Sequence, residues 1–343
     1  MNDAPAFRPR IAITLGDPAG IGPEIALKAV LAPEVWEQCI PVLVGLPAVC
    51  RATAEQVGLV VSVRPTESAA DLRDECGIAN VLAPPGFPDV PLPAPGELDA
   101  QGGQLAFEAI AEAVRLIRAG ELDALCTGPI SKAALNLAGH HYPGHTELLA
   151  EMAGAPLVAM LMVGGGVRVI PATIHCPLED VPQRLTSRRI VDLLDLIDRT
   201  MADFRIERPR IAVCGLNPHA GEDGLLGREE QALIVPAIDE ARAQGIDAAG
   251  PVPADVVFHQ MLQGRWDVVL AMYHDQAMIP VKTLAFDRGV NVTLGLPFVR
   301  TSPDHGTAFD IAGRGIARPD SLIAAVLLAA ELTRNRRAPA KSL

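Results

Sequence analysis

The stretch RIAITLGDPAGIGPEIALKAVL, residues 10–31, decides the fold class of this chain. An apolar run predicts a buried strand over residues 10–17, and a turn rich in glycine and proline follows it. A helix then begins, with Pro23 in its first turn and Glu24 placed favourably against the helix dipole. This order of strand, turn and helix predicts one unit of an α/β fold.

The same order recurs along the rest of the chain, which predicts an α/β protein with a mainly parallel sheet. Residues 83–97 predict a long surface connection, and the glycines of 163–169 predict a hairpin turn. Helical sequence patterns predict helices over 22–31, 47–58, 99–120, 146–153, 187–204, 228–244 and 319–334. Apolar runs predict strands over 10–17, 40–45, 123–129, 156–163, 167–174, 209–215 and 267–273.

Length and composition limit the classes of protein that this chain can form. A chain of 343 residues favours two domains, and 49% hydrophobic against 20% charged residues indicates a soluble globular protein. The net charge of −12 and the absence of a Lys/Arg cluster argue against a nucleic-acid partner. No apolar run approaches the roughly 18 residues of a membrane span. The first ten residues predict a flexible tail without a signal core, and six cysteines without paired spacing favour reduced thiols in the cytoplasm.

Three apolar runs end in a histidine, and these histidines are candidate metal ligands. His175, His219 and His274 each follow a predicted strand, and ligands of open α/β sheets lie beyond the carboxyl ends of strands. Three imidazoles suit Zn and similar divalent ions and leave coordination positions open for substrate or water. The alternative is that each histidine makes ordinary hydrogen bonds in its own loop. Asp255 and Asp275 are possible partners of the ligands.

Other segments carry groups suited to an anionic ligand. The turn within residues 14–25 could present backbone N–H groups to an anion, or it could simply be a tight connection. His145 and Thr146 stand at the start of a predicted helix, where Thr146 could cap the helix or the N-terminus could hold a phosphate or carboxylate. Residues 280–315 place polar and cationic groups in apolar or glycine-rich sequence, among them Lys282, Arg288, Asn291 and Arg300.

Eight motifs, in order from about residue 10 to about residue 330, resemble the 4-hydroxythreonine-4-phosphate dehydrogenase family of vitamin B6 biosynthesis. They are GDPAGIGPE, GPISK, GHTE, TIHCPLEDV, CGLNPHAGE, AMYHDQ, RGVNVTLGLPFVRTSPDHGTA and IAGRG. The resemblance implies an isocitrate dehydrogenase-like fold, with two α/β domains and a cleft between them. Residues 1–140 and 305–343 would form the first domain. Residues 141–304 would form the second, which would carry the metal histidines and the interface of a homodimer.

The resemblance also implies the reaction and the roles of site residues. NAD or NADP would oxidise 4-(phosphooxy)-L-threonine at C3 to 2-amino-3-oxo-4-(phosphooxy)butanoate, which would lose CO₂ to give 3-amino-2-oxopropyl phosphate. A divalent Zn, Mg or Co ion would be held by His175 and His219 of one subunit and His274 of the other. The substrate would contact His145, Thr146, Lys282, Asn291 and Arg300. The expected catalytic residues are His145, Asp255 and Lys282, and the expected cofactor contacts are Gly16, Asp17, Gly20, His305, Gly306 and Asp310.

Several alternatives remain open at this point. Relatives of the same family oxidise 4-phospho-D-threonate, 4-phospho-D-erythronate or aromatic dihydrodiols, and the phosphorylated sugar acids are the harder ones to distinguish. Three histidines could also serve a metal-dependent aldolase or hydrolase, which would turn over without NAD. A metabolite-binding protein would show no turnover at all. The absence of a G-x-S-x-G elbow and of a P-loop disfavours a nucleophilic hydrolase.

Overall fold

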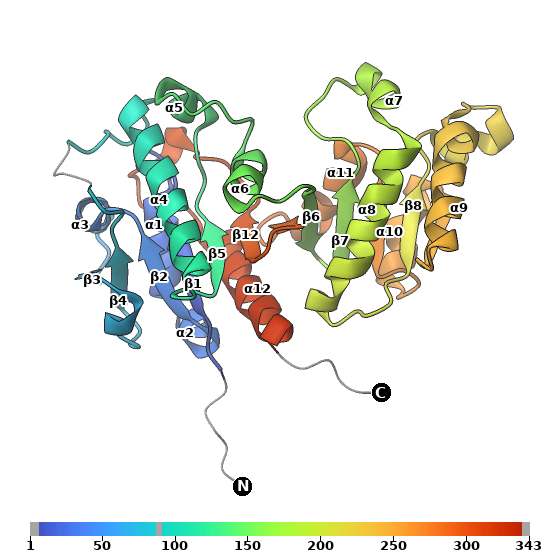
Figure 1. Ribbon diagram of the computed structural model, residues 1–343. Coiled ribbons are helices and arrows are strands. Elements are labelled where there is room, and N and C mark those ends of the chain that lie inside the picture. The colour runs from blue at the N-terminus through green and yellow to red at the C-terminus, as the bar shows by residue number, and fades with distance from the viewer. Residues whose placement is uncertain (1–6, 87–90, 338–343) are drawn as a thin grey trace, which may run out of the picture. The chain divides into compact units, whose positions relative to one another are not determined.

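The computed structural model describes residues 7–86 and 91–337, which form two compact units (Figure 1). Unit 1 comprises the chain up to Pro156 and again from Leu296, and unit 2 comprises Leu157–Gly295. We expected the boundaries at residues 140/141 and 304/305. The difference arises because the helix after residue 144 packs against a helix of unit 1 and because strand Val299–Pro303 pairs with strand Ala124–Thr127 of unit 1. The expected N-terminal tail falls partly on residues 1–6, outside the described part of the chain.

Unit 1 is built on a parallel sheet with the strand order β3-β4-β2-β1-β5-β12. Its core strands are buried along almost their whole length, as expected for a parallel sheet covered on both faces. The strands are β1 (Arg10–Thr14), β2 (Ile40–Val44), β3 (Ser62–Thr66), β4 (Ile78–Leu82), β5 (Ala124–Thr127) and β12 (Val299–Pro303). The helices are α1 (Gly22–Val30), α2 (Pro33–Gln38), α3 (Pro47–Val57), α4 (Ala100–Arg118), α5 (Lys132–Leu137), α6 (His145–Ala153) and α12 (Asp320–Arg337), with short 3₁₀ turns at Ala69–Asp71 and Phe309–Ile311.

Unit 2 has the strand order β11-β6-β7-β10-β8-β9, in which β6 runs antiparallel to both neighbours and the other pairs are parallel. Helices α8 and α9 lie in front of this sheet in Figure 1, and α10 and α11 lie behind it. The strands are β6 (Ala159–Gly164), β7 (Val167–Pro171), β8 (Ile211–Cys214), β9 (Ala248–Val252), β10 (Val268–Ala271) and β11 (Val290–Leu294). The helices are α7 (Val181–Arg184), α8 (Ser187–Thr200), α9 (Val235–Ala243), α10 (Ala254–Leu262) and α11 (His274–Ala285), with short turns at Leu178–Asp180, Met201–Phe204, Pro218–Gly224 and Glu230–Ile234.

Local sequence explains where the predicted elements begin and end. Helix α4 starts after Asp99, whose carboxylate accepts a hydrogen bond from the Gln101 N–H (3.0 Å), and it is followed by Gly120 in the left-handed conformation. Gly165 and Gly166, both with positive φ, make the predicted hairpin turn between β6 and β7. The expected α/β class with a mainly parallel sheet is therefore confirmed.

Five strands and several helices were not predicted. Strands β3, β4, β9, β11 and β12 lack long apolar runs, and the segment 280–303 has a helix and two strands where the sequence indicated only scattered polar groups. Lys282 therefore lies on α11, Asn291 on β11 and Arg300 on β12. Tertiary packing on both sides of each sheet overrides the weak local signal in these segments.

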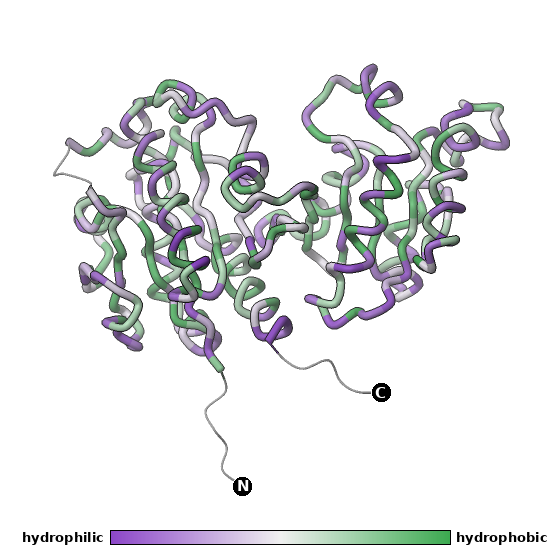
Figure 2. The backbone as a smooth tube through the Cα atoms, viewed as in Figure 1, coloured by the Kyte–Doolittle hydropathy of each residue, from purple (hydrophilic) through white to green (hydrophobic). Residues whose placement is uncertain are grey.

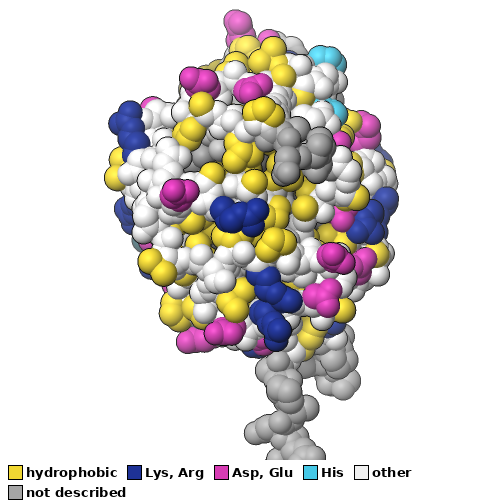
Figure 3. All heavy atoms as spheres, turned by 90° about the vertical axis from the view of Figure 1, so that its left-hand side faces the viewer, with side chains coloured by type: hydrophobic (Ala, Val, Ile, Leu, Met, Phe, Trp, Pro, Cys, Tyr) yellow, Lys and Arg dark blue, Asp and Glu magenta, His cyan; other side chains and the backbone are white. Residues whose placement is uncertain are grey.

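The distribution of hydropathy follows this architecture. Figure 2 shows hydrophobic residues along the strands of each unit and hydrophilic residues on outer helix faces and in loops. The face of the molecule in Figure 3 has Lys and Arg side chains interspersed with acidic and apolar ones, without a continuous basic surface. Within residues 7–86 and 91–337, we find no helix long and apolar enough to cross a membrane.

Candidate functional site

The three candidate metal histidines follow three strands that are neighbours in the sheet of unit 2. His175 comes after β7, His274 after β10 and His219 after β8, and the sheet order is β7-β10-β8. The three strands are parallel, so their carboxyl ends lie at the same edge of the sheet. The prediction that each histidine follows the carboxyl end of a strand is confirmed.

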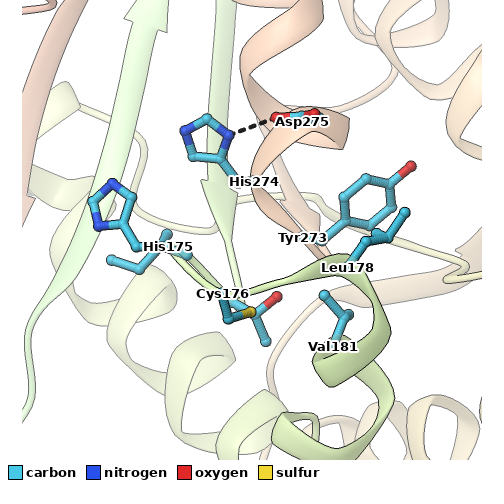
Figure 4. A pocket seen from close by; sticks show the side chains of 9 residues that line it. His175, Cys176, Leu178, Val181, Tyr273, His274 and Asp275 are labelled. Atoms are coloured by element: carbon cyan, nitrogen blue, oxygen red, sulfur yellow. Dashed lines mark hydrogen bonds and ion pairs between the residues drawn. The ribbon is translucent and has the colours of Figure 1, made fainter.

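Two of these histidines lie side by side in a pocket (Figure 4). The ring centroids of His175 and His274 are 5.9 Å apart, and both line a pocket of about 240 Å³ together with Cys176, Tyr273 and Asp275. The Nδ1 atom of His274 is 2.7 Å from Oδ1 of Asp275. This contact leaves Nε2 of His274 as the nitrogen for a metal and matches the carboxylate–histidine pairs that orient metal ligands. Two imidazoles this close fit the nitrogen donor set of a divalent ion.

Buried hydrogen bonds tie the three strand ends to one another. The Thr173 hydroxyl, after β7, donates to the carbonyl of Met272, after β10 (2.8 Å). The side-chain oxygen of Gln276 accepts from the Met272 N–H (2.6 Å), and its Nε2 donates to the carbonyl of Gly215, after β8 (2.8 Å). The strand ends that precede all three histidines therefore share one network.

His219 lies in an unusual turn and is not part of a single-chain cluster. Five consecutive residues, 219–223, have positive φ and form a left-handed turn. Each non-glycine residue in this conformation costs roughly 1–2 kcal/mol, so the surrounding structure must hold the turn. Among the residues that the structure describes, no three or more His, Cys, Asp and Glu side chains come close enough together to hold a metal.

In unit 1, cationic groups gather where β5 and β12 run side by side. Arg300 on β12 is only 1% exposed, and its guanidinium donates to the Thr127 hydroxyl of β5 (2.6 Å). Burial lowers the pKa of Arg300 to about 10. His145 is half-buried at the start of α6, and its pKa lies well below the usual value because of burial and the nearby charges of Arg300 and Lys132. Its buried Nε2 has no hydrogen-bond partner among the described residues.

Of the two interpretations left open for His145 and Thr146, the structure does not show a Thr146 cap, although both residues lie at the start of α6. The helix begins at His145, its N-cap is Gly144 without a side-chain cap, and Thr146 lies inside the first turn. Thr146 is therefore not used as a cap. Its position, one residue after His145, places its hydroxyl group at the N-terminal end of the helix.

The other expected substrate and catalytic residues lie in unit 2. Lys282 is half-buried on α11 with its ammonium 5.3 Å from the ring centre of Phe286. The Oδ1 atom of Asn291 is buried and has no hydrogen-bond partner among the described residues, which suits a donor group of a ligand. Asp255 is exposed in the first turn of α10, and α10 packs against the turn that carries His219.

The early glycine-rich turn is a packing element rather than an open cradle for an anion. The N–H groups of Asp17, Gly20 and Ile21 donate to backbone carbonyls, and the Ala19 N–H donates to the Asp17 carboxylate. A Cβ atom on Gly16 would collide with the Pro129 backbone. Of the two interpretations left open for this turn, the contacts favour the tight connection.

The same turn packs directly against the late glycine-rich loop. The Ile21 N–H donates to the Thr307 carbonyl (2.9 Å), and a Cβ atom on Gly20 would lie 2.9 Å from Thr307. Glu24, which is buried, receives hydrogen bonds from Lys28 (2.7 Å) and from the Ala317 N–H (2.9 Å). The structure thus brings together the two segments in which cofactor contacts were expected, with His305, Gly306 and Asp310 exposed on the late loop.

Four residues of these sites were not singled out from the sequence. Two of them, Lys132 and Thr127, lie near the predicted anion-binding residues His145 and Arg300. The other two, Gln276 and Glu230, accept or donate hydrogen bonds in the segments that lead into His274 and His219. Lys132 belongs to the quoted GPISK motif, which was a signal that could have found it. Glu230 stands in no such motif, because its role depends on contacts across the fold.

Comparison with known proteins identifies the family of this chain. Residues 37–329 match the family model described as pyridoxal phosphate biosynthetic protein PdxA. The chain is 46% identical to a 4-hydroxythreonine-4-phosphate dehydrogenase of Geobacter metallireducens, with 96% of this chain and 97% of the relative covered. A crystal structure of a 4-hydroxythreonine-4-phosphate dehydrogenase from Klebsiella pneumoniae superposes with a TM-score of 0.88 at 41% identity, covering 96% of this chain and 100% of the other.

A third relative has another substrate in its name. The chain is 42% identical to a D-threonate 4-phosphate dehydrogenase of Cupriavidus necator, with 96% of this chain and 99% of the relative covered. All three proteins are named dehydrogenases, and the solved one shares the α/β fold of this chain. This protein is an enzyme, a dehydrogenase that acts on a small phosphorylated substrate. The chain belongs to the family of pyridoxal phosphate biosynthetic proteins PdxA.

Proposed function

We propose that this enzyme oxidises 4-(phosphooxy)-L-threonine at C3 with NAD or NADP as a step in the formation of pyridoxine 5′-phosphate. The main observation behind this proposal is that Arg300, His145 and Lys132 lie close together beside β5. The relatives of this chain are named for phosphorylated four-carbon acids, which such a cluster could bind. Such a cluster stabilises an anion because charge-assisted hydrogen bonds are stronger at a buried site than at the surface.

We assign the expected binding residues to different groups of the substrate. Arg300, His145 and Thr146 bind anionic oxygens of the substrate, and Lys282 and Asn291 supply a further cation and a neutral polar group. Arg300 is fixed by its bond to Thr127, so its guanidinium is oriented before the substrate arrives. Preorganised donors of this kind lose little entropy when they bind.

The chemistry transfers a hydride and a proton, and then releases CO₂. Oxidation removes a hydride from C3, which a bound nicotinamide would accept, and the hydroxyl proton passes to a base as C3 becomes a ketone. The bond between C2 and the carboxyl carbon then breaks, and its electron pair moves toward the C3 carbonyl before C2 is protonated. The product is 3-amino-2-oxopropyl phosphate.

A divalent ion, when bound, supplies Lewis-acid stabilisation of the negative charge that develops on the C3 oxygen in both steps. We assign His175 and His219 of one subunit and His274 of the partner as its ligands, with Zn, Mg or Co as the candidate ions. The contact between His274 and Asp275 supports the role of His274, because a carboxylate of this kind orients a ligating imidazole. His305, Gly306 and Asp310 would contact the nicotinamide cofactor, and Gly16, Asp17 and Gly20 belong to the turn that packs against their loop.

The proton of the C3 hydroxyl needs an acceptor, for which we propose His145 or Asp255, with Lys282 assisting. The lowered pKa of His145 keeps its imidazole neutral at physiological pH, which is the form that accepts a proton. Asp255 lies on the helix that packs against the His219 turn. We further propose that the enzyme is a cytoplasmic homodimer with unit 2 at its interface.

A second candidate substrate is 4-phospho-D-threonate or 4-phospho-D-erythronate. The relative from Cupriavidus necator favours it, since its identity of 42% is close to that of the vitamin B6 relatives. These acids keep the phosphate and differ at C2, where the amino group is replaced by a hydroxyl. An aldolase or hydrolase is not proposed, because the family is one of dehydrogenases.

The test is the formation of NADH at 340 nm after EDTA treatment and re-addition of Zn²⁺, Co²⁺ or Mg²⁺. We expect metal-dependent NADH formation with 4-(phosphooxy)-L-threonine and little with either sugar acid. Activity with the sugar acids alone would move the enzyme to the second candidate. No NADH with any of the three substrates would refute the proposal.

A further inference from the structure

The left-handed turn at His219–Asp223 needs a support that lies outside the turn. Four of its five residues are not glycine, and their φ values range from 43° to 54°. Within the turn region, the Ala220 N–H donates to the Asn217 carbonyl (3.1 Å) and the Leu226 N–H donates to the Gly221 carbonyl (3.0 Å). These two bonds close the turn, but they do not fix it to the rest of unit 2.

The carboxylate of Glu230 supplies that fixation. Its Oε1 atom accepts from the N–H groups of Leu216 (2.8 Å) and Asn217 (2.7 Å), which lead from β8 into the turn. Its Oε2 atom accepts from the side-chain amide of Asn217 (3.0 Å). Glu230 is only 2% exposed, so these bonds replace the water that a carboxylate would otherwise require.

Glycines let the turn approach this carboxylate closely. A Cβ atom on Gly221 would lie 2.5 Å from Oε2 of Glu230, and one on Gly215 would lie 3.3 Å from Oε1. A Cβ atom on Gly227 would collide with the Asn217 amide. The backbone on both sides of His219 is therefore packed around a single buried charge.

The helix that carries Glu230 is also irregular. Residues Glu230–Ile234 form a single π-helical turn before α9, and such turns occur frequently at functional sites. The neighbouring Glu229 accepts a second hydrogen bond from the Asn217 amide (2.8 Å). Both glutamates of the turn thus meet the segment that precedes His219.

We propose that Glu230 is the positioning residue of His219: its buried carboxylate holds the left-handed turn so that the imidazole is set for the divalent ion. This inference rests on the proposed role of His219 as a metal ligand and adds the element that orients it. Residues that orient metal ligands typically change metal affinity by 10–100-fold when they are replaced.

The variant Glu230→Gln tests the inference, because it keeps the shape but places an NH₂ group against the Asn217 amide. Co²⁺ is titrated into the metal-free full-length protein, and its binding is followed by visible absorption. We expect Co²⁺ to bind about 10–100-fold more weakly than to the wild type, with kcat at saturating Co²⁺ changed much less. Affinity within twofold of the wild type would overturn the inference.

Two controls separate positioning from general destabilisation. Glu240→Gln changes an exposed glutamate of α9, and Leu196→Ala truncates a buried side chain of α8 in the same unit. We expect the first to leave both stability and Co²⁺ affinity unchanged and the second to lower stability alone. An equal loss of affinity in Leu196→Ala would overturn the inference. If Glu230→Gln does not fold, Asn217→Ala is used in its place. We then expect Co²⁺ to bind severalfold more weakly, and an unchanged Co²⁺ affinity would contradict the inference.

The variant His219→Ala distinguishes the inference from the proposed function. If His219→Ala still binds Co²⁺ like the wild type, the proposed ligand set is wrong and the inference falls with it. If His219→Ala loses binding while Glu230→Gln keeps it, the ligand set stands and only the positioning role of Glu230 is refuted.

Discussion

Asp17, in the turn after β1, should make the stability of unit 1 depend on pH in an unusual direction. The side chain is 1% exposed, and burial raises the pKa of its carboxyl group from 3.8 to about 6. Its Oδ1 atom accepts from the Ala19 N–H (3.0 Å), while Oδ2 is buried without a partner among the described residues. The charged form therefore pays a desolvation penalty that the hydrogen bond only partly offsets.

The sign and size of the effect follow from linkage. Between the unfolded pKa near 3.8 and the folded pKa near 6, the native state binds the proton that the unfolded state has lost. Stability therefore falls as pH rises through this range, by about 3 kcal/mol in total, and by about 1.4 kcal/mol between pH 5 and pH 7.5. Asp17→Asn removes the titration and keeps the acceptor for the Ala19 N–H.

Urea unfolding of the wild type and of Asp17→Asn at pH 5, 6, 6.8 and 7.5 measures this contribution. The difference in unfolding free energy between variant and wild type should shift in favour of the variant by about 1.4 kcal/mol from pH 5 to pH 7.5. Any constant cost of the buried amide cancels in this comparison. A difference that stays constant within about 0.4 kcal/mol would show that Asp17 keeps an ordinary pKa despite its burial.

Three further perturbations follow from the two sites. The pKa of His145 is lowered in the native state, so below about pH 6.5 the unfolded state binds a proton that the native state excludes. The wild type should therefore lose stability between pH 7 and pH 5. His145→Gln should lose less stability over the same range in the same unfolding assay. Thr127→Val removes the hydroxyl that receives the Arg300 guanidinium (2.6 Å), so KM for the phosphorylated substrate should rise about tenfold in steady-state kinetics, and an unchanged KM would contradict the preorganisation of Arg300. Gln276→Leu removes the hydrogen bonds from Gln276 to the Met272 N–H and the Gly215 carbonyl, which leaves these two buried backbone groups unpaired. The free energy of unfolding, measured by thermal unfolding, should fall by about 2–4 kcal/mol. A fall below about 0.5 kcal/mol would show that the two backbone groups find other partners.

The sequence by itself determined the α/β class, most of the long helices and the place of the three histidines after strands. These features depend on apolar periodicity, on turn residues such as the glycines after β6, and on caps such as Asp99, which act within a few residues of one another. The motifs also identified the family, which the comparisons confirm.

The tertiary structure alone decided which residues support the sites. Residues 280–303 form a helix and two strands through packing, which local propensity did not indicate, and the chain divides at 156/157 and 295/296 because α6 and β12 pack with unit 1. The early glycine-rich turn could have held an anion until its N–H groups were seen to bond within the protein. The roles of Gln276 and Glu230 come from buried hydrogen bonds to residues 61 and 13 positions away, and contacts of that range leave no periodic trace in a sequence.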